Sequence, residues 1–198
     1  GQMRLKKGAL LPVIFLFLSF NILSDGHVQQ APVLFPLETL QCNFNGNKDI
    51  DDLNKIKGEW NDFVQDNEDV SYASWTITPM FRSASDFTND IAWLGVSPSW
   101  TAFGKAYDAW YDRAGDIAAK FDRVYTCDTQ QLFAAQIIRQ TESNSNNGIM
   151  MVSNCSLMND ATLVDIAMAD QKWNAYLDSQ DSEGTIVKWY PGPGTPTN

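Results

Sequence analysis

Histidine is nearly absent from this chain of 198 residues, whose single example is His27. A haem iron bound through histidine, a Ser-His-Asp triad, a Cys-His pair and a multi-histidine zinc site all need an imidazole within the folded part. We expect His27 to be a solvated residue of a flexible N-terminal segment. The sequence therefore excludes these kinds of site from the region that follows.

Basic residues are also scarce. Lys and Arg number 14 against 24 Asp and Glu, which gives a formal net charge of −10, and no basic cluster follows Lys7. Affinity for nucleic acid comes mainly from clustered Lys and Arg, so we expect no nucleic-acid partner. A phosphate-binding glycine loop is missing as well, because the stretch around Gly192 lacks a following Lys-Ser or Lys-Thr pair.

Only one long apolar run is present, at residues 9–23, directly after the basic residues Arg4, Lys6 and Lys7. As a helix it would span about 22 Å, less than the ~30 Å hydrocarbon core of a bilayer. The pattern predicts a cleaved secretory signal within residues 1–31, with an uncleaved anchor as the alternative. We expect a mature chain that begins between Asp25 and Pro32, has no stable membrane span, and is periplasmic or secreted.

What the chain does contain is an internal repeat. Cysteine, aliphatic and aromatic residues recur at a constant offset of 113 positions, so that Cys42 matches Cys155 and the pair Trp60-Asn61 matches Trp173-Asn174. The polar segment 141–148, rich in Ser and Asn, separates the copies. The sequence predicts a first α+β repeat at 32–140, a linker at 141–148 and a second repeat at 149–198.

The first repeat reads as β-α-β-β-α-β. Strands are predicted at residues 34–44, 70–81, 91–96 and 131–139. One helix follows an Asp49 cap, and a second is opened by Ser97-Pro98 and interrupted near Gly115. In the first strand Leu40, Cys42 and Phe44 share one face, which the alternation predicts to be buried.

This order of elements resembles the ferredoxin-like fold, and two such units in tandem resemble the dimeric α+β-barrel superfamily. The Cys/Trp repeat also resembles uncharacterised exported bacterial proteins, a family with no activity to carry over. The resemblance implies two sheets that pair around a small-molecule cavity, with the second repeat packed on the first. It disfavours the superfamily members that hold haem through histidine.

The chain has three cysteines, an odd number, so pairing within an exported protein would leave one of them without a disulfide partner. The ferredoxin-like order implies that the first and fourth strands are neighbours, so that Cys42 could meet Cys127 in a disulfide. Alternatively, all three are small buried hydrophobes. A redox role is disfavoured because no C-x-x-C motif occurs.

The second repeat supplies only a strand, a helix and a strand. We expect the native chain to continue for about 50 to 60 residues and to include a cysteine for Cys155.

Oxygen-bearing side chains at alternate positions from Asn43 to Asp51 imitate a calcium loop. Ile50 stands where the turn glycine belongs, and Ile56 stands where the bidentate glutamate belongs. A turn and a helix cap account for the pattern better, and we expect neither a metal nor another cofactor.

If two sheets close a barrel, the polar strand faces line its cavity; the alternative is that these faces simply meet water. The predicted ligand-binding residues are Gln41, Tyr72, Ser74, Thr76, Asn154, Lys188 and Tyr190.

Three functions are open: a small-molecule-binding protein, a cofactor-free oxygenase or isomerase with Tyr72, Lys188 or Asp86 as its base, and a structural or interaction module. Fold alone does not choose among them.

Overall fold

The computed structural model describes residues 32–81, 88–141, 147–158 and 160–192, so the expected signal segment at 1–31 and Asp86 lie outside the described residues. The described residues form five strands and four helices. Their bounds are β1 Phe35–Phe44, α1 Ile50–Asp66, β2 Ala73–Ile77, β3 Ile91–Val96, α2 Trp100–Arg113, α3 Gly115–Val124, β4 Tyr125–Arg139, α4 Leu163–Ser179 and β5 Ile186–Pro191.

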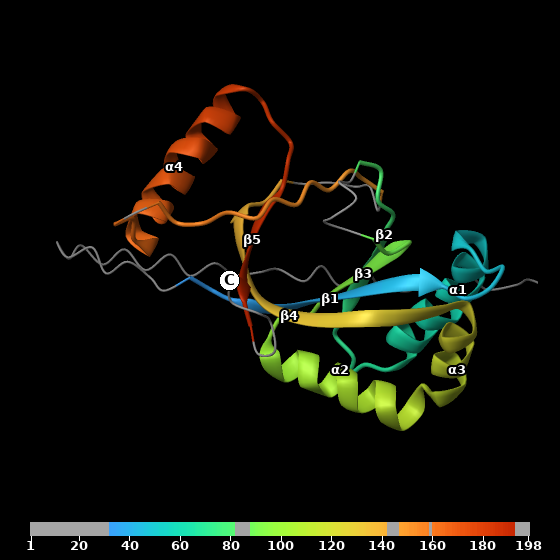
Figure 1. The fold of residues 1–198 in the computed structure, drawn as a ribbon. Helices are drawn as coiled ribbons and strands as arrows, with labels where there is room; N and C mark the ends of the chain where they lie inside the picture. Colours follow the sequence, from blue (N-terminus) through green and yellow to red (C-terminus); the bar gives the residue numbers. More distant parts are fainter. Residues whose placement is uncertain (1–31, 82–87, 142–146, 159, 193–198) are drawn as a thin grey trace, which may run out of the picture. The chain divides into compact units, whose positions relative to one another are not determined.

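The strands make one antiparallel sheet in the order β2-β3-β1-β4-β5 (Figure 1). The first four strands have the ferredoxin-like order, as the resemblance to that fold implied. The fifth strand comes from the expected second repeat and pairs with the outer side of β4. The structure is thus a mixed α+β fold compatible with the α+β-barrel type.

Side chains of β1 alternate between two apolar layers. Leu40, Cys42 and Phe44 point toward α1 and α3, where they pack with buried residues of β3 and of both helices. Leu37 points to the opposite face, against Leu94 and Ala135. The period of two residues therefore predicted the faces of this strand correctly, and both faces carry apolar packing.

The helix termini follow the chemistry of their caps. Asp49 accepts hydrogen bonds from the backbone N–H groups of Asp51 and Asp52, so α1 begins where the sequence predicted. The predicted cap of the second helix was two residues early, because Ser99 and not Ser97 accepts from the N–H of Ala102. The expected interruption near Gly115 is confirmed, since α3 begins there.

Three strand predictions need correction. β2 covers only Ala73–Ile77, shorter than the expected 70–81, and β4 begins at Tyr125 and not at 131. The first strand expected in the second repeat is not formed, because residues 147–158 adopt neither helix nor strand. A strand needs a partner for its backbone groups, and no described strand pairs with this segment.

Helices α1, α2 and α3 lie on one side of the sheet (Figure 1). α1 buries Leu53, Ile56 and Phe63, whereas α4 buries none of its residues. Polar contacts hold α4 to the edge of the sheet: Arg139 of β4 pairs with Asp178, and Asn174 donates to the backbone carbonyl of Ile138. The sheet and its first three helices therefore contain the core that positions the site.

Candidate functional site

A carboxylate lies buried in the middle of the sheet. Glu38 is on β1, pairs across the sheet with Gly95 and Leu132, and shares the helix-facing side with Leu40 and Cys42. Its exposed fraction is 3%. Burying a charge costs several kcal/mol unless hydrogen bonds or an opposite charge compensate it, so the surroundings of Glu38 determine its role.

Three side chains from three separate parts of the chain donate hydrogen bonds to Glu38. The hydroxyl of Tyr72, just before β2, lies 2.6 Å from Oε1. The hydroxyl of Tyr107 on α2 and the Nε2 group of Gln130 on β4 both reach Oε2, the latter at 3.0 Å. These contacts join residues 34 to 92 positions apart in the chain, so only the folded sheet assembles them.

The direction of each hydrogen bond follows from the donors available. The indole N–H of Trp93 can only donate, and it lies 3.0 Å from the Tyr72 hydroxyl, so Tyr72 must give its own hydrogen to Glu38. Gln130 likewise donates to the Tyr107 hydroxyl, which leaves the Tyr107 hydrogen for Glu38. The hydroxyl hydrogens of both tyrosines and the Nε2 group of Gln130 are therefore directed at the carboxylate, which acts only as an acceptor.

A glycine makes room for this arrangement. A Cβ atom at Gly95 would lie 1.7 Å from the Tyr72 hydroxyl oxygen and 2.3 Å from its Cζ. Glycine inside a strand often marks a place where another group approaches the backbone closely. Gly95 therefore permits Tyr72 to cross over β3 and reach Glu38.

The carboxylate forms part of the wall of a pocket of about 260 Å³ between the sheet and α2. Its lining residues are Glu38, Phe103, Tyr107, Gln130 and Leu132. The Phe103 and Tyr107 rings lie side by side on α2, with centroids 4.8 Å apart. The pocket thus combines one buried negative group, an amide, two aromatic rings and an aliphatic side chain.

Burial, and then the negative charge of Glu38, raises the pKa of both tyrosine hydroxyls above the ordinary tyrosine value. Both effects disfavour the phenolate, because it would be poorly solvated and close to a like charge. Tyr72 and Tyr107 therefore remain hydrogen-bond donors at any ordinary pH.

The predicted site residues fall into separate places. Tyr72, Ser74 and Thr76 all face the helices, whereas the polar face of this strand was expected to line a barrel cavity or to meet water. Ser74 accepts from the indole of Trp60 at 3.1 Å. The Thr76 hydroxyl is buried and has no hydrogen-bond partner among the described residues. Gln41 lies on the opposite face of the sheet.

The residues expected from the second repeat lie at the far edge. Lys188 and Tyr190 are on β5, four strands away from β2. Lys188 pairs with Asp170 of α4, and the Tyr190 hydroxyl donates to Gln136 at 3.1 Å. Asn154 is exposed in the segment without helix or strand. The structure therefore brings only Tyr72 of the predicted set to the Glu38 group.

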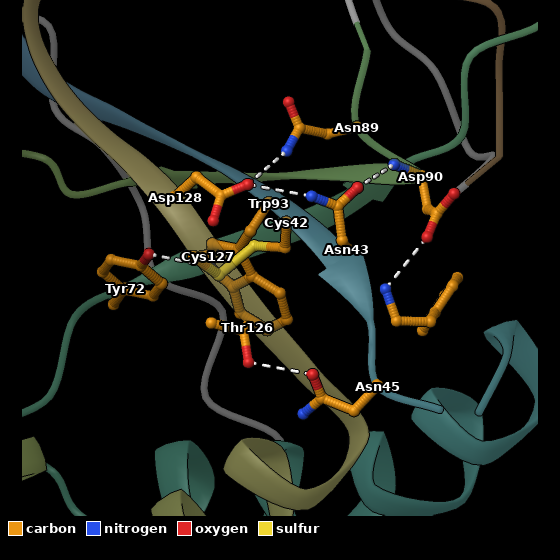
Figure 2. The surroundings of a disulfide bond; sticks show 11 residues. Cys42, Asn43, Asn45, Tyr72, Asn89, Asp90, Trp93, Thr126, Cys127 and Asp128 are labelled. Atoms are coloured by element: carbon orange, nitrogen blue, oxygen red, sulfur yellow. Dashed lines mark hydrogen bonds between the residues drawn. A yellow bond between two sulfur atoms is a disulfide. The ribbon is translucent and has the colours of Figure 1, made fainter. Parts of the chain in front are cut away.

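The predicted disulfide between Cys42 and Cys127 is present and joins the paired strands β1 and β4 (Figure 2). Trp93 lies beside it, and Tyr72 accepts from the Trp93 indole in the same view (Figure 2). Asp128, next to Cys127, accepts from the side-chain amides of Asn43 and Asn89. Cys155 is exposed and is not in a disulfide.

A second and larger hollow lies on the other side of α2. Its volume is about 540 Å³, and its lining residues are Asp69, Lys105, Asp108, Ala109, Asp112 and Arg113. Arg113 pairs with Asp69 at 2.8 Å and holds the pKa of that carboxyl below its usual value. This hollow is a charged surface cleft with no buried polar group.

Sequence reasoning missed Glu38, Tyr107 and Gln130. A signal for Glu38 was present in the sequence. Glu38, Leu40, Cys42 and Phe44 are every second residue of one strand, so an acidic residue lies on the face predicted to be buried. Gly95 within an apolar strand was a second signal. Tyr107 and Gln130 gave no comparable signal, because their contact with Glu38 depends on the packing of α2 and β4.

The residues that the structure describes contain no group of three or more His, Cys, Asp or Glu side chains able to hold a metal ion. Within those same residues, no helix is long and apolar enough to cross a bilayer.

Comparison with known proteins adds little. No family model and no curated protein matches the chain. A crystal structure of a chlorite dismutase-like protein matches with a TM-score of 0.34 and 9% sequence identity, over 52% of this chain and 45% of that protein. The match spans less than half of that protein, and a similarity this low carries no information on activity.

Proposed function

We propose that this chain is a small-molecule-binding protein and that the Glu38 pocket is its binding site. The observation that carries the proposal is a carboxylate, 3% exposed, in the wall of a 260 Å³ hollow, held by three donors. A packed core is normally built from apolar groups, and a buried ionic group is weak evidence for stability. Pockets that combine apolar walls with a few convergent polar groups are typical of small-molecule sites.

This site differs in position from the barrel cavity that the polar strand faces suggested. The Glu38 pocket lies between α2 and the helix-facing side of the sheet, and Gln41 faces the other way. We keep the barrel cavity only as an alternative location, and the experiment below distinguishes the two.

Binding is tested by NMR on the full chain with three probes of one shape: 2-phenylethylammonium, 2-phenylethanol and 3-phenylpropanoate. The reporter is the side-chain amide of Gln130, which contacts both Glu38 and Tyr107. We expect at least one probe to shift this signal in a saturable way. If none of the three probes shifts this signal, the pocket is not a binding site, and the result favours the alternative of a structural or interaction module.

A pair of variants gives the control. Leu132→Trp fills the pocket with a large ring and should abolish the shift. Leu163→Trp makes the same substitution at a position 66% exposed on α4 and should leave it unchanged. Probe binding that survives Leu132→Trp would place the ligand elsewhere, such as in a barrel cavity.

A cofactor-free isomerase or oxygenase is the second candidate function, and one observation favours it. Glu38 places a carboxylate, the kind of group that acts as a general base, in the wall of the pocket. Such a chain should accelerate the exchange of the α-protons of 4-phenyl-2-butanone for deuterium, and Glu38→Gln should abolish this exchange. Probe binding without any proton exchange would contradict the enzyme and support a protein that only binds a small molecule.

We also propose that the protein works outside the cytoplasm, in the periplasm or after secretion. A disulfide between Cys42 and Cys127 persists in an oxidising compartment, and the basic start with its short apolar run supports a cleaved signal. The intact mass of exported protein should show a chain beginning between Asp25 and Pro32. Retention of Arg4 in that material would contradict export by cleavage.

Finally, we propose that 149–198 is the second copy of a tandem repeat. α4 and β5 match α1 and β2 in order and at the repeat offset. The matching tryptophans differ in burial: Trp60 of α1 is half-buried against the core, whereas Trp173 of α4 is 52% exposed.

A further inference from the structure

We propose that the Glu38 pocket selects a small organic cation, specifically a primary ammonium ion on a short apolar group. This inference rests on the proposed binding function and names the class of its ligand. Three observations carry it: the charge of Glu38, the free acceptor capacity of its carboxylate and the nature of the pocket walls.

Among the residues that the structure describes, no basic side chain forms an ion pair with Glu38. Its three partners are two phenols and an amide, which are neutral donors. Hydrogen bonds from neutral donors lower the cost of burying the carboxylate without removing its charge. A cationic ligand supplies an opposite charge, whereas an anionic ligand would be repelled.

The carboxylate can accept a further hydrogen bond. Two oxygens of a carboxylate offer about four acceptor positions, and donors among the described residues use three of them. Oε2 accepts from Tyr107 and Gln130, while Oε1 accepts from Tyr72 alone. One acceptor position of the carboxylate therefore remains for an ammonium N–H. A hydroxyl group can also donate to the carboxylate, but only an ammonium group adds the attraction between two full charges, which is stronger at a buried site than in water.

The walls fit the rest of such a ligand. Phe103 and Tyr107 present aromatic rings, and a cation near a ring face is attracted by its negative centre. Leu132 adds an aliphatic surface for an apolar group. A volume of about 260 Å³ is below the usual range for drug-sized ligands, so the pocket admits only a small molecule.

The test compares two probes that differ chiefly in charge. Isothermal titration of the full chain with 2-phenylethylammonium and with 2-phenylethanol should show the ammonium ion binding about tenfold more tightly or better. Glu38→Gln keeps the side-chain shape, removes the charge and should abolish the difference. Asp108→Asn removes a neighbouring negative charge of α2 that does not line this pocket, and should leave the preference intact.

Each outcome bears on one proposal. Equal affinity for the two probes in the unmodified protein, with Leu132→Trp still abolishing both, overturns the cation preference and keeps the binding site. Loss of the preference in Asp108→Asn attributes it to the general acidity of the surface and also overturns the inference. If Glu38→Gln does not fold, Phe103→Leu replaces it and should weaken ammonium binding more than alcohol binding. Binding of neither probe refutes the site itself.

Discussion

Glu38 depends on neighbours that can approach it closely, and Gly95 is the residue that permits this. Replacing Gly95 by alanine would place a methyl group 1.7 Å from the Tyr72 oxygen. Tyr72 must then move and lose its contacts with Glu38 and Trp93. We expect Gly95→Ala to lower the free energy of unfolding by about 1 to 3 kcal/mol, the cost of leaving a buried polar group unsatisfied.

Urea denaturation measures this loss, and Gly104→Ala is its control. Gly104 is on α2 with no heavy atom within 4 Å of an added Cβ, so alanine there should stabilise the helix by up to about 1 kcal/mol. A Gly95→Ala protein as stable as the parent would show that Tyr72 does not need this space.

The same residues predict how stability changes at alkaline pH. Burial first, and Glu38 second, raises the pKa of Tyr72 and Tyr107 in the folded state. In the unfolded chain these tyrosines ionise near pH 10. Above that pH the folded state binds more protons than the unfolded state, so stability must fall as the pH rises. Below pH 10 the contribution is fully present.

We expect the free energy of unfolding to fall between about pH 10 and 11, and to fall less steeply in Tyr107→Phe. Urea denaturation at several pH values measures both slopes. An unchanged slope in the variant would mean that the Tyr107 hydroxyl is not held in its protonated form by the fold.

At the scale of elements, the disulfide ties the two central strands together. It closes a separation of 85 residues between Cys42 and Cys127, and the chain-entropy model assigns a loop of this length roughly 4 to 5 kcal/mol as an upper value. We expect the Cys42→Ala/Cys127→Ala protein to lose most of this stability in urea denaturation. Cys155→Ala, at an exposed cysteine outside the disulfide, should change it by less than about 0.5 kcal/mol.

Peptide mapping without reduction checks the pairing itself. The fragment containing Cys42 should be linked to the fragment containing Cys127. A link from Cys155 to either of them would refute the arrangement of β1 beside β4.

The helices should differ in local stability. α1 buries three residues against the sheet, whereas α4 buries none and is held by polar contacts with β4 and β5. We expect backbone amides of α4 to exchange with solvent through openings of about 1 to 2 kcal/mol, well below those of α1. Hydrogen exchange followed by mass spectrometry measures both helices together. Equal protection would mean that α4 is covered by a partner surface.

The sequence predicted the helices and strands more accurately than the contacts between them. Local pattern predicted the Asp49 cap, α1 and β3. The pairing of Cys42 with Cys127 was implied by the resemblance to the ferredoxin-like fold. Alternation divides β2 into two faces but does not show which one the helices cover. The helices cover the polar face, which was expected to line a cavity or to meet water. β5 pairs with β4 at one edge of the sheet. This contact joins strands that are far apart in the sequence, and no local pattern predicts it.

For the molecule as a whole, the net charge of −10 creates a negative field that raises the local concentration of any cation. This field assists an ammonium ligand, but it also favours unspecific binding at acidic places such as the cleft of Asp69, Asp108 and Asp112. Affinity alone therefore does not locate the site. The Glu38 pocket differs from that cleft because its carboxylate is buried and its walls are aromatic.

A crystal structure of the protein with 2-phenylethylammonium bound tests the central claim most directly. The account predicts the ammonium nitrogen within about 3.2 Å of a Glu38 oxygen, with the phenyl ring between Phe103 and Leu132 and the Tyr72 and Tyr107 contacts retained. A probe bound only at the cleft of Asp69 and Asp108, with the Glu38 pocket empty, would contradict it.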